Sequence, residues 1–299
     1  MKHYPLIFVA ILVFAIANYL GNILLAMGVM RNYGLVQDSN MLILGHSHIM
    51  LALNKDILGK ELNVPVSKYT REGVNIEERF LMAQQYLNSP HSGKLKCVII
   101  GVDPYLFNRG GLSQNSYVNF YPFLGDTVID SYIRKNSTPL EYWKVKSLPL
   151  CRYSDSTINS AISGWFKKNG ASNKYGVVDI TRVKKEIAIG KYRPILRDAK
   201  MEAVFQKTID CFTQRKIRVI LLNAPLLDLY NNLEPEAHKE LDSIFTQCAN
   251  TNALVEYWDY SRAFEHDYSL FRDPIHLNRN GQMKLSNEVA KRLKMEHYF

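Results

Sequence analysis

The sequence has few cysteines, and they do not fall in a pattern that builds a metal or redox site. Only four occur in the chain, at Cys97, Cys151, Cys211 and Cys248. No two of them form a CxxC pair, which argues against a structural zinc site and a thioredoxin-like function. Cys97 and Cys211 lie in apolar or helical patterns and are interpreted as small core residues. A disulfide remains open outside the cytoplasm, but the sequence does not select a pairing.

Other signatures of common functions are also missing. The sequence shows no internal repeat, low-complexity tract or collagen-like pattern. Gly101 and the pair Gly110-Gly111 lack the spacing of a phosphate-binding loop or a dinucleotide fingerprint, so no cofactor is expected. His46 and His48 stand two residues apart without a nearby carboxylate pair, and no metal site is predicted from them.

The charge is basic but not concentrated. The formal net charge is +9 and the pI is about 9.2. Lys and Arg are scattered along the chain, and their only tight pairs are Lys167-Lys168 and Lys184-Lys185. Nucleic-acid binding usually needs a clustered basic face, so no nucleic-acid partner is expected. A basic surface near anionic lipid is the simpler interpretation.

The longest apolar run lies near the N-terminal end. Residues 5–30 are almost wholly apolar, with Lys2 before them and Arg31 after them, and about 20 such residues span a bilayer as a helix. A cleaved signal peptide is the alternative, because Ala15-Ile16-Ala17 resembles a small-residue cleavage pattern. Cleavage there leaves a strongly apolar end, so we favour an uncleaved anchor. Both interpretations place the remainder outside the cytoplasm, provided that the charged amino end stays inside.

From residue 41 onward, short apolar runs alternate with helical patterns. Strands are predicted at 41–44, 64–69, 95–100, 217–222 and 254–258. Helices are predicted at 49–58, 76–87, 197–215, 235–250 and from 280 or 281 to 293. This alternation indicates a parallel sheet with right-handed crossovers. We therefore predict an α/β fold with a five-stranded parallel sheet in a domain at 35–299, preceded by a membrane anchor and linker at 1–34.

The alternation is interrupted between about residues 105 and 194. This segment is rich in Tyr, Asn, Ser and Gly, with only weak helical patterns near 127–134 and 158–168. A structureless loop of such length is rare inside a compact domain. We interpret the segment as an insertion that lies over the carboxyl edge of the sheet. Its aromatic residues suit a substrate wall or a plain packing surface equally well.

Two short motifs occur where an open α/β sheet binds its ligands, beyond the carboxyl ends of the strands. The first is GHSH at residues 45–48, and the second is DPIH at residues 273–276. Ser47 alone is also explained as a helix N-cap. The spacing of Asp273 and His276 lets the carboxylate reach the Nδ1 side of the imidazole and leaves Nε2 free, as a general base requires.

With these motifs, the chain resembles the SGNH (GDSL-like) hydrolase superfamily and, within it, the membrane-anchored branch that includes DltD-type and alginate-acetylation proteins. The resemblance covers roughly residues 40–293 without the insertion. It implies a flavodoxin-like three-layer α/β/α sandwich in which Ser47 is the nucleophile, His276 the base and Asp273 the residue that orients the base. Gly73, after the second strand, matches the glycine whose backbone N–H contributes to the oxyanion hole.

The chain departs from the family pattern at two places. His46 replaces the aspartate beside the serine, and Asp103 stands where the Gly-x-Asn block has an asparagine that donates to the oxyanion. A carboxylate only accepts hydrogen bonds and repels developing negative charge, and loss of one such donor costs on the order of 10²–10³ in rate. Asp103 then points away, holds a substrate hydroxyl, or signals lost hydrolytic activity. The membrane-anchored branch tends to lack a clear Gly-x-Asn block, so the departure favours that branch over a secreted lipase.

These observations and the resemblance together predict a function. We expect a membrane-anchored, extracytoplasmic serine esterase or O-acyltransferase that acts on a cell-envelope polysaccharide or polymer through Ser47, Asp273 and His276. Gly73, Asp103 and His46 are the expected oxyanion or substrate-binding residues. The alternative is a catalytically weak or inactive partner of the same fold that binds polysaccharide or a membrane O-acyltransferase.

Overall fold

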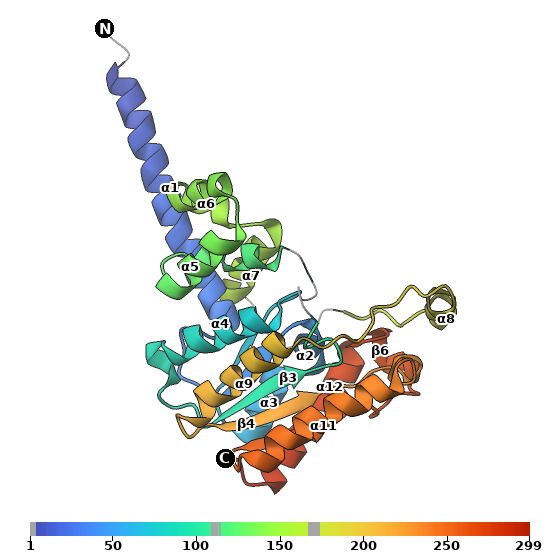
Figure 1. Ribbon diagram of the computed structural model, residues 1–299. Coiled ribbons are helices and arrows are strands. Elements are labelled where there is room, and N and C mark those ends of the chain that lie inside the picture. The colour runs from blue at the N-terminus through green and yellow to red at the C-terminus, as the bar shows by residue number, and fades with distance from the viewer. Residues whose placement is uncertain (1–3, 109–112, 114, 167–173) are drawn as a thin grey trace. The chain divides into compact units, whose positions relative to one another are not determined.

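The computed structural model describes residues 4–108, 113, 115–166 and 174–299 (Figure 1). The chain divides into two compact units. Unit 1 comprises Met1–Val36 and Asn115–Asn169, and unit 2 comprises Gln37–Gln114 and Gly170–Phe299.

The sheet of unit 2 has five parallel strands in the order β2-β1-β3-β4-β5. The strands are β1 (Met41–Gly45), β2 (Val66–Thr70), β3 (Cys97–Val102), β4 (Arg218–Asn223) and β5 (Val255–Asp259). The predicted α/β fold with a five-stranded parallel sheet is therefore confirmed, and each strand lies within two residues of its predicted limits. Every residue of β1 and β3 is buried, as expected for apolar strands with helices on both faces.

Helices cover both faces of this sheet (Figure 1). α3 (Lys55–Leu62) and α12 (Arg279–Met295) pack together on one face, and α4 (Ile76–Leu87) and α9 (Ala199–Thr213) pack together on the other. α11 (Pro235–Thr251) joins α9 through an edge-to-face pair of Phe205 and Phe245, whose ring centroids lie 5.9 Å apart. The remaining helices of unit 2 are α2 (Ser47–Ala52), η1 (Pro90–Ser92), α8 (Ile180–Ala188), α10 (Asp228–Asn231) and η4 (Tyr268–Leu270).

One predicted helix is divided in the structure. The sequence predicted a single helix over 49–58, but α2 ends at Ala52 and α3 begins at Lys55. The break follows from Asn54, whose Oδ1 accepts the backbone N–H of Asp56 at 2.9 Å and so caps a new helix. Asparagine is favoured at N-caps because its side chain satisfies a backbone donor that has no partner within the helix. The helix that follows the first strand is therefore short.

Unit 1 is assembled around α1 (Tyr4–Tyr33), which packs along α7 (Asp155–Phe166). The other elements of this unit are η2 (Ser116–Phe123), α5 (Thr127–Asn136), α6 (Pro139–Ser147) and η3 (Pro149–Arg152). α5 and α7 match the two weak helical patterns, except that residues 167 and 168 lie outside the described residues. α1 is long and apolar enough to be a membrane anchor or a signal sequence.

The two strongly polar residues within the apolar run of α1 both have partners in unit 1. Asn18 Oδ1 accepts the backbone N–H of Leu150 at 2.9 Å, and Asn22 Oδ1 accepts the hydroxyl of Tyr153 at 2.9 Å. Further along, the backbones of α1 and α7 come very close, since a Cβ added to Gly164 would lie only 1.8 Å from the carbonyl oxygen of Gly28. The asparagines and the glycine therefore serve the packing of this helix.

Candidate functional site

Ser47 is presented at the start of α2, directly after β1. The turn is tight because a Cβ on Gly45 would lie 2.5 Å from Ile49 Cγ2, and one on Gly101 of β3 would lie 2.5 Å from Ile49 Cβ. Any larger residue would push the first turn of α2 away from the sheet. The N-cap of α2 is His46, whose Nδ1 accepts the backbone N–H of His48 at 2.8 Å. The capping role that also suits Ser47 is thus filled by its neighbour.

The structure brings Ser47, His276 and Asp273 together. Ser47 Oγ lies 2.9 Å from His276 Nε2, and both carboxylate oxygens of Asp273 lie 2.9 Å from His276 Nδ1. These distances are within hydrogen-bonding range along the whole chain of three groups. The arrangement is the one in which a carboxylate orients an imidazole that can accept a proton from a serine hydroxyl.

Asp273 and His276 are held by a small antiparallel pair of strands that the sequence did not predict. β6 (Phe271–Asp273) pairs with β7 (His276–Leu277), and Asp273 is directly opposite His276. Asp273 Oδ1 also accepts the backbone N–H groups of Ile275 at 3.1 Å and of His276 at 3.0 Å. Burial raises the pKa of Asp273, but the hydrogen bond and charge of His276 outweigh it and the pKa falls below its usual value. The carboxylate is therefore kept ionised beside the imidazole.

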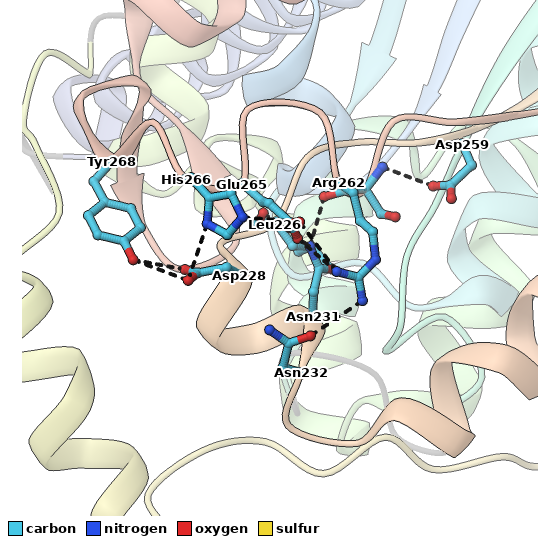
Figure 2. A network of polar contacts seen from close by, with 10 residues as sticks. Leu226, Asp228, Asn231, Asn232, Asp259, Arg262, Glu265, His266 and Tyr268 are labelled. Atoms are coloured by element: carbon cyan, nitrogen blue, oxygen red, sulfur yellow. Dashed lines mark hydrogen bonds and ion pairs between the residues drawn. The ribbon is translucent and has the colours of Figure 1, made fainter.

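The segment before this pair of strands is fixed to α10 by a network of polar contacts (Figure 2). Asn231 Nδ2 donates to the carbonyl oxygen of Ser261 at 3.0 Å and to Glu265 Oε2 at 2.9 Å. The hydroxyl of Tyr268 donates to Asp228 at 3.1 Å. The backbone N–H of Leu227 donates to the carbonyl oxygen of Pro274, between Asp273 and His276. The network thus ties the chain that carries the acid and the base to the chain that follows β4.

A pocket of about 420 Å³ opens beside these groups. It is lined by Ser47, Gly73, Tyr105, Arg193, Tyr230, Asp273, Pro274, Ile275 and His276. Gly73 has φ +74°, and a Cβ there would lie 2.9 Å from Ser113 Cβ, so the turn requires glycine. The family resemblance implies that this residue is a backbone donor, and it lines the same pocket as Ser47.

Three lining residues were missed by sequence reasoning. Tyr105 follows β3 by three residues, whereas Arg193 and Tyr230 come from distant parts of the chain with no spacing that relates them to Ser47. Burial, with further effects from Tyr230 and Asp103, raises the pKa of Tyr105, so its hydroxyl keeps its proton. The pocket therefore offers two phenol rings and a guanidinium group beside the serine.

Asp103 is paired inside the protein and is not among the residues that line the pocket. Its Oδ2 lies 2.8 Å from His46 Nε2 and 3.3 Å from the Arg79 guanidinium, and its Oδ1 accepts the backbone N–H of Tyr105 at 2.9 Å. Burial raises the pKa of Asp103, but His46 and Arg79 outweigh it and hold the pKa well below its usual range. Both oxygens are thus occupied, and His46 and Asp103 form a buried support under the serine turn.

Two further buried polar side chains connect α2 to the rest of unit 2. His48 Nε2 lies 3.4 Å from the carbonyl oxygen of Pro225, and burial lowers the pKa of His48 to about 4, so the ring is neutral at physiological pH. At the other end of α2, Lys68 Nζ donates to the carbonyl oxygens of Met50 and Leu53 at 2.7 and 2.6 Å. Lysine at a helix C-terminus complements the helix dipole. Among the described residues no group of three His, Cys, Asp or Glu side chains is arranged to hold a metal ion.

Comparison with known proteins finds structural likenesses only. No family model matches the chain, and no curated protein matches its sequence. A Streptococcus pneumonia structure provisionally described as a platelet activating factor is 11% identical at a TM-score of 0.41, with 97% of this chain and 99% of that chain covered.

Two other solved structures are enzymes acting on esters or lipids by name. A Corynascus thermopiles carbohydrate esterase of family 2 with a carbohydrate-binding domain is 10% identical at a TM-score of 0.40, with 87% of this chain and 66% of that chain covered. A lipase from a goat rumen metagenome is 13% identical at a TM-score of 0.35, with 84% and 95% covered.

Proposed function

We propose that the chain is a serine esterase or O-acyltransferase of the SGNH type. The observation that carries the proposal is the continuous contact from Ser47 Oγ through His276 to Asp273, at the edge of an open pocket. A serine hydroxyl is a weak nucleophile until an adjacent base removes its proton. The distances found here support that role for His276, with Asp273 as its orienting group.

The reaction proceeds through an acyl-enzyme. Ser47 Oγ attacks the ester carbonyl while its proton passes to His276 Nε2, and the oxyanion that forms is stabilised by backbone N–H groups of Gly73 and of the serine turn. Collapse breaks the bond to the alcohol, which leaves with the proton from His276. Water or a sugar hydroxyl then gives its proton to His276 and attacks the acyl group. The bond from the acyl carbon to Ser47 Oγ breaks, and Ser47 leaves with the proton from His276.

The proposal also includes the location of the protein and the class of its substrate. The packing of α1 against the helices of unit 1 supports a retained anchor rather than a removed signal peptide. The proposal places unit 2 on the outer side of the membrane. Tyr105 and Tyr230 place aromatic residues in the pocket lining, as suits a sugar, and Arg193 adds positive charge there. We therefore assign the substrate to acyl esters on a cell-envelope polysaccharide or polymer, and no bound cofactor is needed for this chemistry.

A fluorophosphonate probe tests the proposal, because it modifies only a serine that is activated and accessible. The full-length protein in detergent is expected to be labelled, and Ser47→Ala and His276→Ala are expected to abolish labelling. Ser131→Ala changes an exposed serine of unit 1 and serves as the matched control, with labelling unchanged. A folded wild-type protein that is not labelled would overturn the esterase proposal and favour a non-catalytic partner that binds polysaccharide or a membrane O-acyltransferase.

A further inference from the structure

The helical part of the insertion exposes large apolar side chains next to α1. Leu140 and Trp143 of α6 are 83% and 61% exposed. Leu148, directly before η3, is 38% exposed, and Leu150, within η3, is 40% exposed. We call these four residues the α6–η3 tip. Scattered exposed apolar residues are normal on a protein surface, but several gathered in a short segment indicate a surface that contacts something apolar.

The tip is continuous with the apolar surface of α1. Leu150 packs on α1 so closely that a Cβ added to Gly21 would lie 2.9 Å from Leu150 Cδ2. Its backbone N–H donates to Asn18, which is 7% exposed. On the other sides of α1, Leu20 and Leu24 remain exposed at this level of the helix. Through Leu150, the α6–η3 tip therefore adjoins the apolar surface that α1 presents.

Helix length places this level of α1 inside a bilayer. A membrane-spanning helix uses about 20 residues to cross the hydrocarbon core. Counted from Tyr4, the first described residue of α1, such a window ends near Ile23, and counted back from Tyr33 it begins near Phe14. Asn18 and Gly21 fall inside both windows. The exposed apolar side chains of α1 concentrate between Leu6 and Leu24 and favour the first window. In that window, the residues that contact Leu150 lie in the leaflet at the C-terminal end, below the membrane surface.

The polar contacts at this level fit the same conclusion. Polar groups in hydrocarbon must be satisfied within the protein. The side chain of Asn18 has the backbone N–H of Leu150, and that of Asn22 has the hydroxyl of Tyr153. The insertion thus supplies the partners that allow two asparagines to stand in the apolar run of α1.

We propose that the α6–η3 tip inserts into the lipid leaflet that the C-terminal half of α1 crosses, so that unit 1 is held by α1 and by a second, shallow element. The proposal relies on the membrane anchoring assigned to α1 above. Tryptophan, the residue type at position 143, concentrates at membrane interfaces. Exposed Arg134, Lys135 and Lys144 accompany the tip and suit anionic lipid headgroups.

Brominated lipids test this contact directly, because bromine on the acyl chains quenches only nearby tryptophan. The full-length protein is reconstituted into phosphatidylcholine–phosphatidylglycerol vesicles with and without bromine at acyl positions near the headgroup. Trp165→Phe leaves Trp143 and the fully buried Trp258, and Trp143→Phe with Trp165→Phe leaves Trp258 alone. The first variant is expected to lose the emission of Trp143, and the second is expected to keep its emission. Equal emission in both kinds of vesicle for the first variant would overturn the proposal and leave a protein partner as the occupant of the tip.

Two controls separate this proposal from the anchoring and from the esterase chemistry. Resistance to alkaline carbonate extraction reports whether α1 is embedded, and extraction of the protein would remove the basis of the proposal. Fluorophosphonate labelling of the same samples reports the Ser47 site independently.

A polarity-sensitive dye on the exposed thiol of Cys151 in η3 gives a second readout that needs no tryptophan substitution, with Cys151→Ser as its control. A blue shift of the dye on vesicle incorporation supports insertion, and an unchanged spectrum contradicts it.

Discussion

His46 and Asp103 contact each other beneath the serine turn, with Nε2 of the ring 2.8 Å from Oδ2 of the carboxylate and both side chains almost fully buried. His46 Nδ1 accepts the backbone N–H of His48, so the ring proton is assigned to Nε2, the ring nitrogen next to Asp103. The pair thus links the end of β3 to the first turn of α2. Of the three interpretations of Asp103 that the sequence left open, this geometry supports the one in which the carboxylate points away from the reacting centre.

Asp103→Asn is expected to destabilise the protein without improving activity. The amide removes the negative charge that faces the buried Arg79 guanidinium, and breaking a buried ion pair on one side costs about 3–5 kcal/mol. Urea unfolding of the variant measures this loss. Asp38→Asn removes one member of an exposed ion pair with Lys94 and is expected to leave the free energy of unfolding almost unchanged. A variant of full stability with faster ester hydrolysis would show instead that residue 103 faces the oxyanion.

Asp273→Asn is expected to leave the fold intact and slow the chemistry. The amide oxygen can still accept the backbone N–H groups of Ile275 and His276. The amide NH₂ favours the wrong imidazole tautomer, which in a serine protease lowers kcat by about 10⁴. The rate constant for fluorophosphonate labelling measures the effect. Asp267→Asn, in the preceding loop, is the control and is expected to react at the wild-type rate. Wild-type labelling by the Asp273 variant would remove that residue from the proposed mechanism.

Gly73→Ala tests the backbone donor. Residue 73 has φ +74° and the new methyl would meet Ser113 Cβ at 2.9 Å, so the turn must move. A displaced oxyanion donor costs on the order of 10²–10³ in rate. Gly190→Ala is a close control, because Gly190 has φ +69° but no atom within 4 Å of the new methyl. kcat/KM for a small acetyl ester is expected to fall only for the first variant, and equal effects of both variants would refute a special role for Gly73.

Most of the fold follows from local pattern, whereas three of the residues that line the pocket do not. β1 and β3 are recognisable as short apolar runs because both faces of the sheet are covered, and Asp273 and His276 are adjacent enough in sequence to be related by spacing. Arg193 and Tyr230 reach the pocket only through tertiary packing. The role of Asp103 depends on Arg79, 24 residues earlier on α4, and a motif comparison does not include that partner.

The hydrophobic pattern of the sequence also did not predict how the segment at 105–194 is organised. Its helices α5, α6 and α7 belong to unit 1 with α1, whereas its two ends belong to unit 2. α6 gives no amphipathic signal in sequence because Leu140 and Trp143 are exposed while Tyr142 and Val145 are buried. When the surroundings of a helix are assumed to be water, every apolar residue is predicted to lie in the core, including one on an exposed face. The same residues fit a helix that contacts both protein and lipid.

Acid is expected to destabilise the protein partly through His48. Burial lowers the folded-state pKa of His48 from 6.5 to about 4, so between these values the unfolded chain binds more protons. Stability is therefore lost as the pH falls from 6.5 to 4, by up to about 3 kcal/mol from this residue. His48→Gln is expected to flatten this part of the pH–stability curve, measured by urea unfolding at fixed ionic strength. His266→Gln, which changes an exposed histidine, is the control. An unaltered slope in the His48 variant would contradict its burial as a neutral ring.

Gly164→Ala is expected to loosen α7 from α1 while leaving the serine site unchanged. The added methyl would overlap the carbonyl oxygen of Gly28, at 1.8 Å, so the two helices must separate. Overpacking of this kind costs about 1–3 kcal/mol. Separation also breaks the hydrogen bond from Trp165 Nε1 to the carbonyl oxygen of Leu24 and the stacking of Arg31 on the Trp165 ring.

Limited proteolysis of the full-length protein in detergent measures the effect of Gly164→Ala, because α7 becomes a substrate when it leaves α1. Gly125→Ala, with no atom within 4 Å of the new methyl, is the matched control in the same unit and is expected to resist cleavage as the wild type does. All residues that line the pocket lie in unit 2, so fluorophosphonate labelling of Ser47 is expected to persist in both variants. Protease resistance of Gly164→Ala equal to that of the wild type would show that the close helix contact does not hold unit 1 together, and α1 would then be an anchor that is only tethered to the insertion.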